Sequence, residues 1–356
     1  MKQFLVIQTA FLGDAVLVTS IVEKLHAFYP DAAIDLVVRK GNDGLFFEHP
    51  FLRKLHVWDK RQGKTRALFR LIGELRKTRY DHIFNAQRFL STGLMTVLAR
   101  GKEKVGFDKN PLSFLFTRTV KHEIPEPSAL RQAQGDKFPS DVVARPSKDI
   151  VHEVDRLNAL IAHLTDGARP LPKLHPSPGI REEVEHVVHK YTEDKGRYVC
   201  IAPSSVWYTK QWPEKKWVEL VRSLPPELHL FYIGAPTPSD YSMCERIASA
   251  SGRGEVVIEE LPSPLASAVL MQGAVMNYVN DSAPLHIASA MNAPVTAVFC
   301  STVPEFGFGP LNANGRIAQL NEPLPCRPCG LHGYKACPEG HFRCALGIDP
   351  QQVVHA

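Results

Sequence analysis

Polar residues that could bind an anion gather where an apolar run meets a predicted helix. The stretch "YVNDSAPLHIASAMNAPVTAVF" (278–299) places Asp281, Ser282 and His286 at this junction. Asp281 or Ser282 can cap the helix, and the amides and dipole at a helix N-terminus favour an anion. The junction therefore predicts a phosphate-binding turn, with His286 about one turn into the helix. The alternative is a capped helix whose histidine is satisfied in the core.

A second candidate is a carboxylate in "QTAFLGDAVLVT" (8–19), where an apolar strand precedes a turn and Asp14 begins a helix. Asp14 could act only as a helix cap that accepts hydrogen bonds from first-turn amides. Alternatively, it could lie at the carboxyl end of a parallel strand, where open α/β sheets bind ligands. The single Gly13 of this turn excludes the G-x-G-x-x-G dinucleotide fingerprint.

A third candidate is a lysine in the loop of "IAPSSVWYTKQWP" (201–213), which follows another predicted strand. Ser204 and Ser205 come directly after the strand, and Lys210 lies between Trp207 and Trp212. At the carboxyl end of a strand, Lys210 could pair with a phosphate. The alternative is an ordinary solvated loop lysine.

The segment "CRPCGLHGYKACPEGHFRC" (326–344) has the composition of a small metal knot, with C-x-x-C spacing and Gly and Pro turns. We expect a structural metal ion, zinc above all, although metal-free thiols or disulfides would also fit. His332 and His341 are alternative ligands. The four expected ligands are Cys326, Cys329, Cys337 and Cys344.

A basic stretch spans residues 60–79, in which eight Lys or Arg residues face the single acid Glu74. Such a stretch is either a solvated helix face or a surface that meets anionic lipid or an anionic glycan core.

Alternating apolar runs and amphipathic stretches must position these groups. The predicted strands are 4–8, 34–38, 54–58 and 82–86 in the first half, and 198–202, 228–234, 255–259, 274–279 and 294–299 in the second. Predicted helices lie between most of them. This alternation predicts an α/β protein with two doubly wound domains that face each other across a cleft.

The domain boundary follows from composition. The segment 125–149 is rich in Pro, Ser and Gln and predicts a mobile insertion, and the proline-rich segment 167–179 predicts the linker. We therefore expect a first domain over 1–170 and a second domain over 171–356 that includes the cysteine-rich tail.

Overall composition limits the class of protein. The 356 residues are 44% hydrophobic and 22% charged, with a net charge of +5, which is typical of a soluble protein and too weak to indicate nucleic-acid binding. No segment approaches the ~20 apolar residues of a membrane span. The apolar run of residues 4–7 is too short for a signal peptide, so we expect a cytoplasmic protein.

Taken together, these motifs resemble glycosyltransferase family 9, the ADP-heptose:lipopolysaccharide heptosyltransferases. The segment "FLGDAVLVTSIVEKL" is similar to the N-terminal Gly-Asp motif of that family, and "IAPSSVWYTKQWP" to its Lys-x-Trp-Pro segment. The segment "NDSAPLHIASAMNAPVTAVF" is similar to its Asp-Ser-Gly-x-x-His segment, with Ala283 where the family usually has Gly. The tail resembles that of the heptosyltransferase II branch.

The resemblance implies a GT-B fold with an N-terminal acceptor domain and a C-terminal nucleotide-sugar domain. It also implies inversion at the anomeric carbon without a catalytic metal. By motif match, Asp14 would be the general base, Lys210 would contact the diphosphate and Asp240 the ribose. The remaining expected donor-binding positions are Ser204, Ser205, Asp281, Ser282, Ala283 and His286.

The expected partners are an ADP-heptose donor and a lipid-linked or glycan acceptor, with peripheral contact at the inner membrane surface. Arg88, in the loop after the fourth predicted strand, is a candidate for binding an acidic group of the acceptor. Two alternatives are a non-catalytic nucleotide-sugar-binding protein on the same fold and a transferase that uses another nucleotide sugar.

Overall fold

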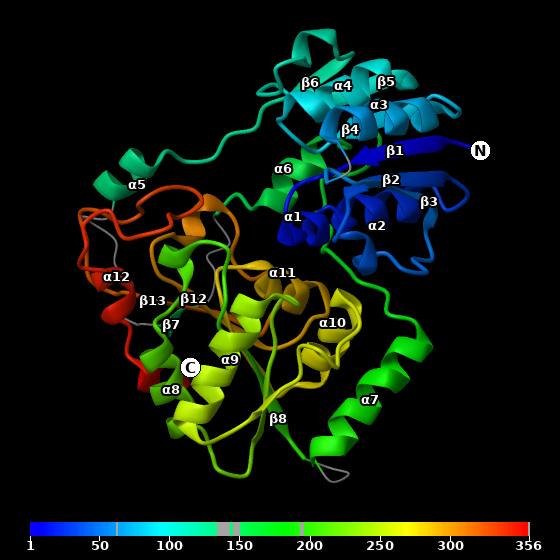
Figure 1. Ribbon diagram of the computed structural model, residues 1–356. Helices are drawn as coiled ribbons and strands as arrows, with labels where there is room; N and C mark the ends of the chain where they lie inside the picture. The colour runs from blue at the N-terminus through cyan, green and yellow to red at the C-terminus, as the bar shows by residue number, and fades with distance from the viewer. Residues whose placement is uncertain (62, 134–142, 145–149, 193–195, 355–356) are drawn as a thin grey trace. The chain divides into compact units, whose positions relative to one another are not determined.

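The computed structural model describes residues 1–61, 63–133, 143–144, 150–192 and 196–354. The chain forms two compact units (Figure 1). The first unit comprises residues 1–123 and 153–175, and the second comprises residues 124–152 and 176–356.

The first unit is built on a six-stranded parallel sheet with the order β3-β2-β1-β4-β5-β6. Helices α3 and α4 lie over one face of the sheet, and α1, α2 and α6 lie over the other (Figure 1). The strands are β1 (Gln3–Ile7), β2 (Ala33–Arg39), β3 (Leu52–Trp58), β4 (Arg79–Asn85), β5 (Arg100–Phe107) and β6 (Arg118–Val120). The helices are α1 (Leu12–Leu17), α2 (Thr19–Phe28), α3 (Lys64–Leu75), α4 (Leu90–Leu98) and α6 (Glu153–Ala159).

The second unit contains a seven-stranded sheet with the order β10-β9-β8-β11-β12-β13-β7, in which only the edge strand β7 is antiparallel. The strands are β7 (Val143–Ala144), β8 (Tyr198–Ala202), β9 (His229–Tyr232), β10 (Glu255–Val256), β11 (Met276–Asn280), β12 (Val295–Phe299) and β13 (Gly315–Gln319). The helices are α5 (Pro127–Ala133), α7 (Pro178–Thr192), α8 (Glu214–Ser223), α9 (Pro238–Ser251), α10 (Pro264–Gly273), α11 (Ala283–Ala290), α12 (Arg343–Leu346) and α13 (Pro350–Val354).

Apolar residues at helical spacing explain how the helices pack on these sheets. On α3, one apolar face is buried against β1 and β2, while the opposite side of the helix carries exposed cations. The buried face consists of Leu68, Leu71, Ile72 and Leu75. In the second unit, Trp212 packs edge-on against Trp217 of α8, with ring centroids 5.1 Å apart. The contact between the two tryptophans anchors the end of the loop that follows β8 to α8.

The predicted α/β class with two doubly wound sheets is confirmed, and each predicted strand overlaps an observed one. Strands β5, β6, β7 and β13 were not predicted. Charged residues interrupt β5 ("RGKEKVGF"), so it lacks the apolar run that marks a central strand. Within the segment 125–149, α5 and β7 are ordered elements, and the other positions from 134 onward lie outside the described residues.

The cores hold the three scattered cysteines that the sequence places in apolar surroundings, Cys200, Cys244 and Cys300, and all three are buried. No helix in the described part of the chain combines the length and the apolar character needed to cross a lipid bilayer.

Candidate active-site residues

A buried ion pair joins two of the predicted site residues at the carboxyl edge of the second sheet. Lys210 ends a single 3-10 turn (Tyr208–Lys210) in the loop after β8, and its Nζ lies 2.7 Å from Oδ2 of Asp281, which follows β11. The hydroxyl of Thr302, beyond β12, donates to the same carboxylate oxygen at 2.6 Å. The side chains of Lys210 and Asp281 are only 15% and 6% exposed. Three loops therefore meet at one carboxylate.

The amino end of α11 lies directly beside this pair. Ser282 occupies the N-cap position, but its side chain makes no capping hydrogen bond, and Ala283 begins the helix. Asp281 is not the cap, because its carboxylate is engaged with Lys210 and Thr302. The amides of Ser282 and Ala283 precede the first intrahelical hydrogen bonds, so they point toward any anion bound at this end.

His286 lies one turn into α11 and is 6% exposed. Its Nδ1 is buried and has no hydrogen-bond partner among the described residues. Burial, helped by the charge of Lys210 and opposed by that of Asp281, lowers the pKa of His286 to about 4. His286 is therefore a neutral imidazole at pH 7, and it can give a ligand a hydrogen bond but no positive charge.

The other predicted donor-binding residues form a second polar group after β8 and β9. Oδ2 of Asp240, in the first turn of α9, accepts hydrogen bonds from the hydroxyl of Ser204 at 2.6 Å and the amide of Ala235 at 3.0 Å. The carbonyl of Ser205 accepts a hydrogen bond from the side chain of Gln211. These bonds tie Asp240 to the loop that also carries Lys210.

Asn280, the last residue of β11, is a positioning residue that the sequence analysis missed. Its Oδ1 accepts the amide of Trp212 at 3.0 Å, and its Nδ2 donates to the carbonyl of Pro203 at 2.6 Å. The side chain therefore bridges both ends of the loop that carries Lys210. An asparagine at the end of an apolar run is the only sequence signal of this role.

In the first unit, Asp14 lies in the first turn of α1 and is partly buried. Its Oδ2 accepts the amide of Phe11 at 3.2 Å, and the buried Asn42 donates to the carbonyl of Ala10 at 3.0 Å. Burial, and then the negative charge of Glu153, raise the pKa of Asp14 to about 6, against the opposing charge of Arg39. A carboxylate with this pKa is suited to accept a proton near neutral pH.

Cations gather at the same edge of the first sheet. Arg39 ends β2 and stacks over the ring of Phe11, and its charge interacts with those of Asp14 and Arg61. Lys60 donates to the carbonyl of Thr9 at 3.1 Å. The predicted acceptor residue Arg88 is exposed in the loop that follows β4. The edge thus combines a proton acceptor with groups that attract an anion.

The cysteine-rich tail packs on the core of the second unit through Cys326, Cys337 and the buried Cys344. Sγ of Cys326 lies 3.7 Å from Nε2 of His341. The tail, all of which is described, nevertheless brings no three of its cysteine, histidine or acidic ligand atoms within 4.8 Å of one another. This arrangement is looser than a closed tetrahedral metal site, in which Zn–S bonds are about 2.3 Å long, so metal binding at Cys329 and its neighbours stays a prediction.

Asn280→Ala should lower the free energy of unfolding by about 2–3 kcal/mol, because it leaves the Trp212 amide and the Pro203 carbonyl buried without partners. It should also weaken binding of a nucleoside diphosphate, since the Lys210 loop loses its anchor. Asn277→Ala is the matched control, because Asn277 lies on the same strand, is fully buried and bonds two carbonyls. Denaturant unfolding and calorimetric titration with ADP check both effects. If the two variants bind ADP with equal affinity, Asn280 does not position the Lys210 loop for nucleotide binding.

Asp14→Asn should stabilise the protein at pH 7.5 by about 1–3 kcal/mol. The folded-state pKa lies above the usual value, so ionisation on going from pH 4 to 6 weakens the fold, and an amide avoids this penalty. The gain should largely vanish at pH 4, where Asp14 is protonated. Urea unfolding at both pH values measures the difference. A loss of stability at pH 7.5 would indicate that Asp14 serves the fold as a helix cap.

Comparison with known proteins identifies the family of the chain. The family model of glycosyltransferase family 9 (heptosyltransferase) matches residues 138–334, more than half of the chain. Lipopolysaccharide heptosyltransferase 3 of Escherichia coli is 24% identical over 305 residues, covering 82% of each chain. Lipopolysaccharide heptosyltransferase 1 of Pseudomonas aeruginosa is 24% identical over 343 residues, covering 91% of this chain and 85% of the relative.

Solved structures share the fold. The E. coli ADP-heptose lipopolysaccharide heptosyltransferase II superposes with a TM-score of 0.74 at 19% identity, over 100% of this chain and 97% of the other. An E. coli heptosyltransferase with ADP gives 0.66 at 20% identity, over 89% and 92%. An iron-containing dodecameric glycosyltransferase of enterotoxigenic E. coli gives 0.54 at 14% identity, over 99% and 74%. The two sheets thus form a GT-B fold, and the chain belongs to glycosyltransferase family 9, as an enzyme that transfers sugars.

Proposed function

We propose that this enzyme moves a heptose from ADP-heptose to a lipopolysaccharide core or a related surface glycan, with inversion at the anomeric carbon. The relatives that match along most of the chain are lipopolysaccharide heptosyltransferases. The observation that carries the proposal is the group formed by Lys210, Asp281 and His286 at the amino end of α11. It combines a cation, unpaired amides and a neutral hydrogen-bonding ring, which suits a diphosphate.

The donor side would act on the leaving group. As the glycosidic bond breaks, negative charge grows on the diphosphate, and Lys210 with the amides of Ser282 and Ala283 would stabilise that charge. Asp281 holds Lys210 in place through the 2.7 Å ion pair. His286 would add a hydrogen bond from one turn further along, and Asp240 would meet a ribose hydroxyl. This chemistry requires no metal ion.

The acceptor side would supply the base. The acceptor oxygen attacks the anomeric carbon, the bond from that carbon to the phosphate oxygen breaks, and Asp14 takes the hydroxyl proton. One carboxylate suffices because the displacement is direct, whereas a covalent intermediate would require a second carboxylate close by. The raised pKa of Asp14, about 6, makes it a stronger base than an ordinary aspartate and leaves it mostly ionised at pH 7.5.

An anionic acceptor would meet the cations around Asp14. Arg39 and Lys60 lie at this edge, and Arg88 would extend it. The outer side of α3 adds exposed cations beside the exposed Phe69, which would suit the head-group surface of an anionic membrane. We therefore propose that the enzyme works on the cytoplasmic side, in peripheral contact with the membrane. The exposed cations of α3 are Lys64, Arg66 and Arg70.

Release of ADP from ADP-heptose tests the function. Purified enzyme should release ADP rapidly only when a lipopolysaccharide-core acceptor is present, and the product should have the inverted anomeric configuration. If the enzyme is active with a different nucleotide sugar and inactive with ADP-heptose, the donor is that other sugar. ADP-heptose binding without turnover against any core acceptor would favour a nucleotide-sugar-binding role.

Lys210→Met should weaken ADP binding and lower kcat together, the latter by about 10²–10³-fold, which is typical of losing a group that stabilises transition-state charge. Since the substitution also strands the buried Asp281, the double variant Lys210→Met/Asp281→Asn should recover stability but not activity. Lys215→Met, at an exposed position of α8, serves as the control. Unchanged ADP affinity in the single variant would mean that the diphosphate binds elsewhere.

Elemental analysis of protein purified without chelator tests the tail. We expect one metal ion per chain, zinc above all, held in a structural role by Cys326, Cys329, Cys337 and Cys344. The variant Cys326→Ser/Cys329→Ser should lose it and unfold at a lower temperature. A wild-type chain without stoichiometric metal would leave free thiols as the better account.

A further inference from the structure

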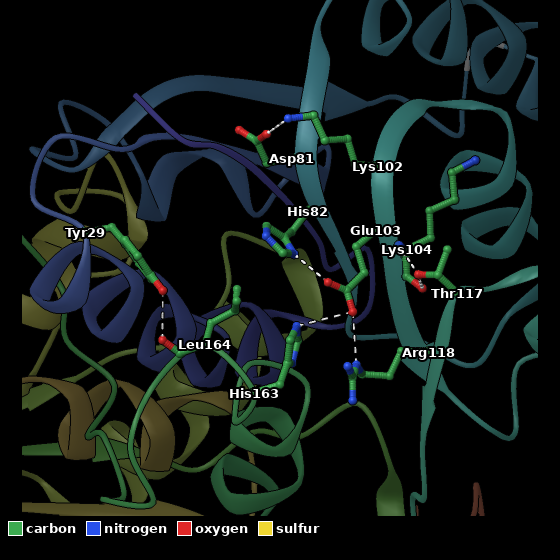
Figure 2. A network of polar contacts seen from close by, with 10 residues as sticks. All are labelled: Tyr29, Asp81, His82, Lys102, Glu103, Lys104, Thr117, Arg118, His163 and Leu164. Carbon is green, nitrogen blue, oxygen red and sulfur yellow. Dashed lines mark hydrogen bonds and ion pairs between the residues drawn. The ribbon is translucent and has the colours of Figure 1, made fainter.

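Two histidines and a glutamate, His82, His163 and Glu103, meet beside the first sheet (Figure 2). Nδ1 of His82 lies 3.1 Å from Oε2 of Glu103, and Nε2 of His163 lies 3.5 Å from Oε1 of the same carboxylate. The three ligand atoms all lie within 4.8 Å of one another. We name these three residues the His82 cluster.

The fold holds these residues rigidly. His82 of β4 and Glu103 of β5 are direct neighbours in the parallel register, so their side chains leave the sheet on the same face. His163 comes from the turn at 160–164, which follows α6. Its ring lies 5.9 Å from that of His82, centroid to centroid. Two neighbouring strands therefore supply His82 and Glu103, and the turn after α6 supplies His163.

The rings of the His82 cluster contact Glu103, yet three of their nitrogens make no hydrogen bond among the described residues. Nδ1 of His82 and both ring nitrogens of His163 are buried without a hydrogen bond in the described part of the chain. The short distances to Glu103 are thus contacts without hydrogen-bond geometry. Buried polar atoms normally have partners, so the two nitrogens that face the carboxylate, Nδ1 of His82 and Nε2 of His163, indicate a missing ligand.

The protonation states suit a cation. Burial lowers the pKa of both His82 and His163, so each ring is neutral at pH 7 and offers a lone pair. Burial opposes ionisation of Glu103, but the hydrogen bond from Arg118 and the nearby imidazoles outweigh it and lower its pKa. Arg118 donates to Oε1 at 3.0 Å, which orients the carboxylate and leaves Oε2 facing His82.

We propose that the His82 cluster binds one divalent transition-metal ion, such as Zn²⁺ or Co²⁺. Two imidazoles and one carboxylate form a ligand set that such ions favour. Metal–ligand bonds of about 2.0–2.2 Å place neighbouring ligand atoms roughly 3–3.5 Å apart, close to the observed separations. The ion would tie the turn after α6 to β4 and β5, and so would stabilise the first unit without entering the transfer chemistry.

A second group in the same unit, Glu23, His49 and His175, has similar composition but is less suited to a metal. Nδ1 of His49 accepts the amide of Phe51, so the neutral ring carries its proton on Nε2. That nitrogen therefore has no lone pair to offer. Nε2 of His175 is also 2.7 Å from Glu23, at hydrogen-bond distance. This group provides a matched control.

The test is calorimetric titration of Co²⁺ into the full-length chain carrying Cys326→Ser/Cys329→Ser, which removes two of the four tail thiolates that could compete. We expect one Co²⁺ per chain and a higher melting temperature when Co²⁺ is present. His163→Asn and Glu103→Gln should each weaken Co²⁺ binding at least tenfold and abolish the rise in melting temperature. His175→Asn should leave both unchanged.

Two results would overturn the proposal. One is a parent protein that binds no Co²⁺. The other is a His163→Asn variant that keeps the parental stoichiometry and affinity. Circular dichroism establishes that each variant is folded, and agreement between the His163 and Glu103 variants guards against an indirect effect of one substitution. The test does not depend on transferase activity, so it stands apart from the proposed function.

Discussion

The buried ion pair between Lys210 and Asp281 links three loops at the carboxyl edge of the second sheet. Each loop follows a different strand. One loop carries Asp281, and the other two bring Lys210 and Thr302 to its carboxylate. A buried pair recovers its desolvation cost only when further hydrogen bonds satisfy it, and here Thr302 supplies one. The pair thus fixes the position of the lysine beside α11, where a diphosphate would bind.

Asp281 in the second unit and Asp14 in the first lie in different surroundings. Asp281 faces a cation and a hydroxyl, which stabilise its charge. Asp14 is partly buried and interacts with the negative charge of Glu153, which raises its pKa to about 6. A carboxylate whose pKa is raised in this way is suited to act as a base. The ionised form of Asp14 therefore destabilises the fold of the first unit, which is expected of a carboxylate whose role is catalytic.

Much of this arrangement could be predicted from the sequence. Apolar runs located the strands, and the family resemblance assigned both Lys210 and Asp281 to the donor-binding region. The direct pairing of Lys210 with Asp281 was not expected, because sequence spacing does not give side-chain distance. Strand β5 was missed because charged residues interrupt its apolar run. One of them is Glu103, and its contact with His82 depends on a neighbouring strand that the local sequence does not reveal.

The residues that support the site escaped prediction for a similar reason. Asn280, Asn42 and Glu153 act across separations of tens of residues, through hydrogen bonds or charge, and no local pattern marks them. The metal prediction in the tail rested on spacing alone, and the described tail does not bring three ligand atoms together. Local patterns located the elements and the chemical groups, while tertiary contacts decide which groups meet.

The central claim is that Asp14 accepts the acceptor's proton. The most direct measurement is the pH dependence of kcat/KM for ADP-heptose transfer, in wild type and in Asp14→Asn. Wild-type activity should fall tenfold per pH unit below about pH 6, and the variant should be slower by roughly 10²–10⁴-fold at pH 7.5, with unchanged ADP affinity. A variant with near wild-type turnover and the same acid limb would contradict this account.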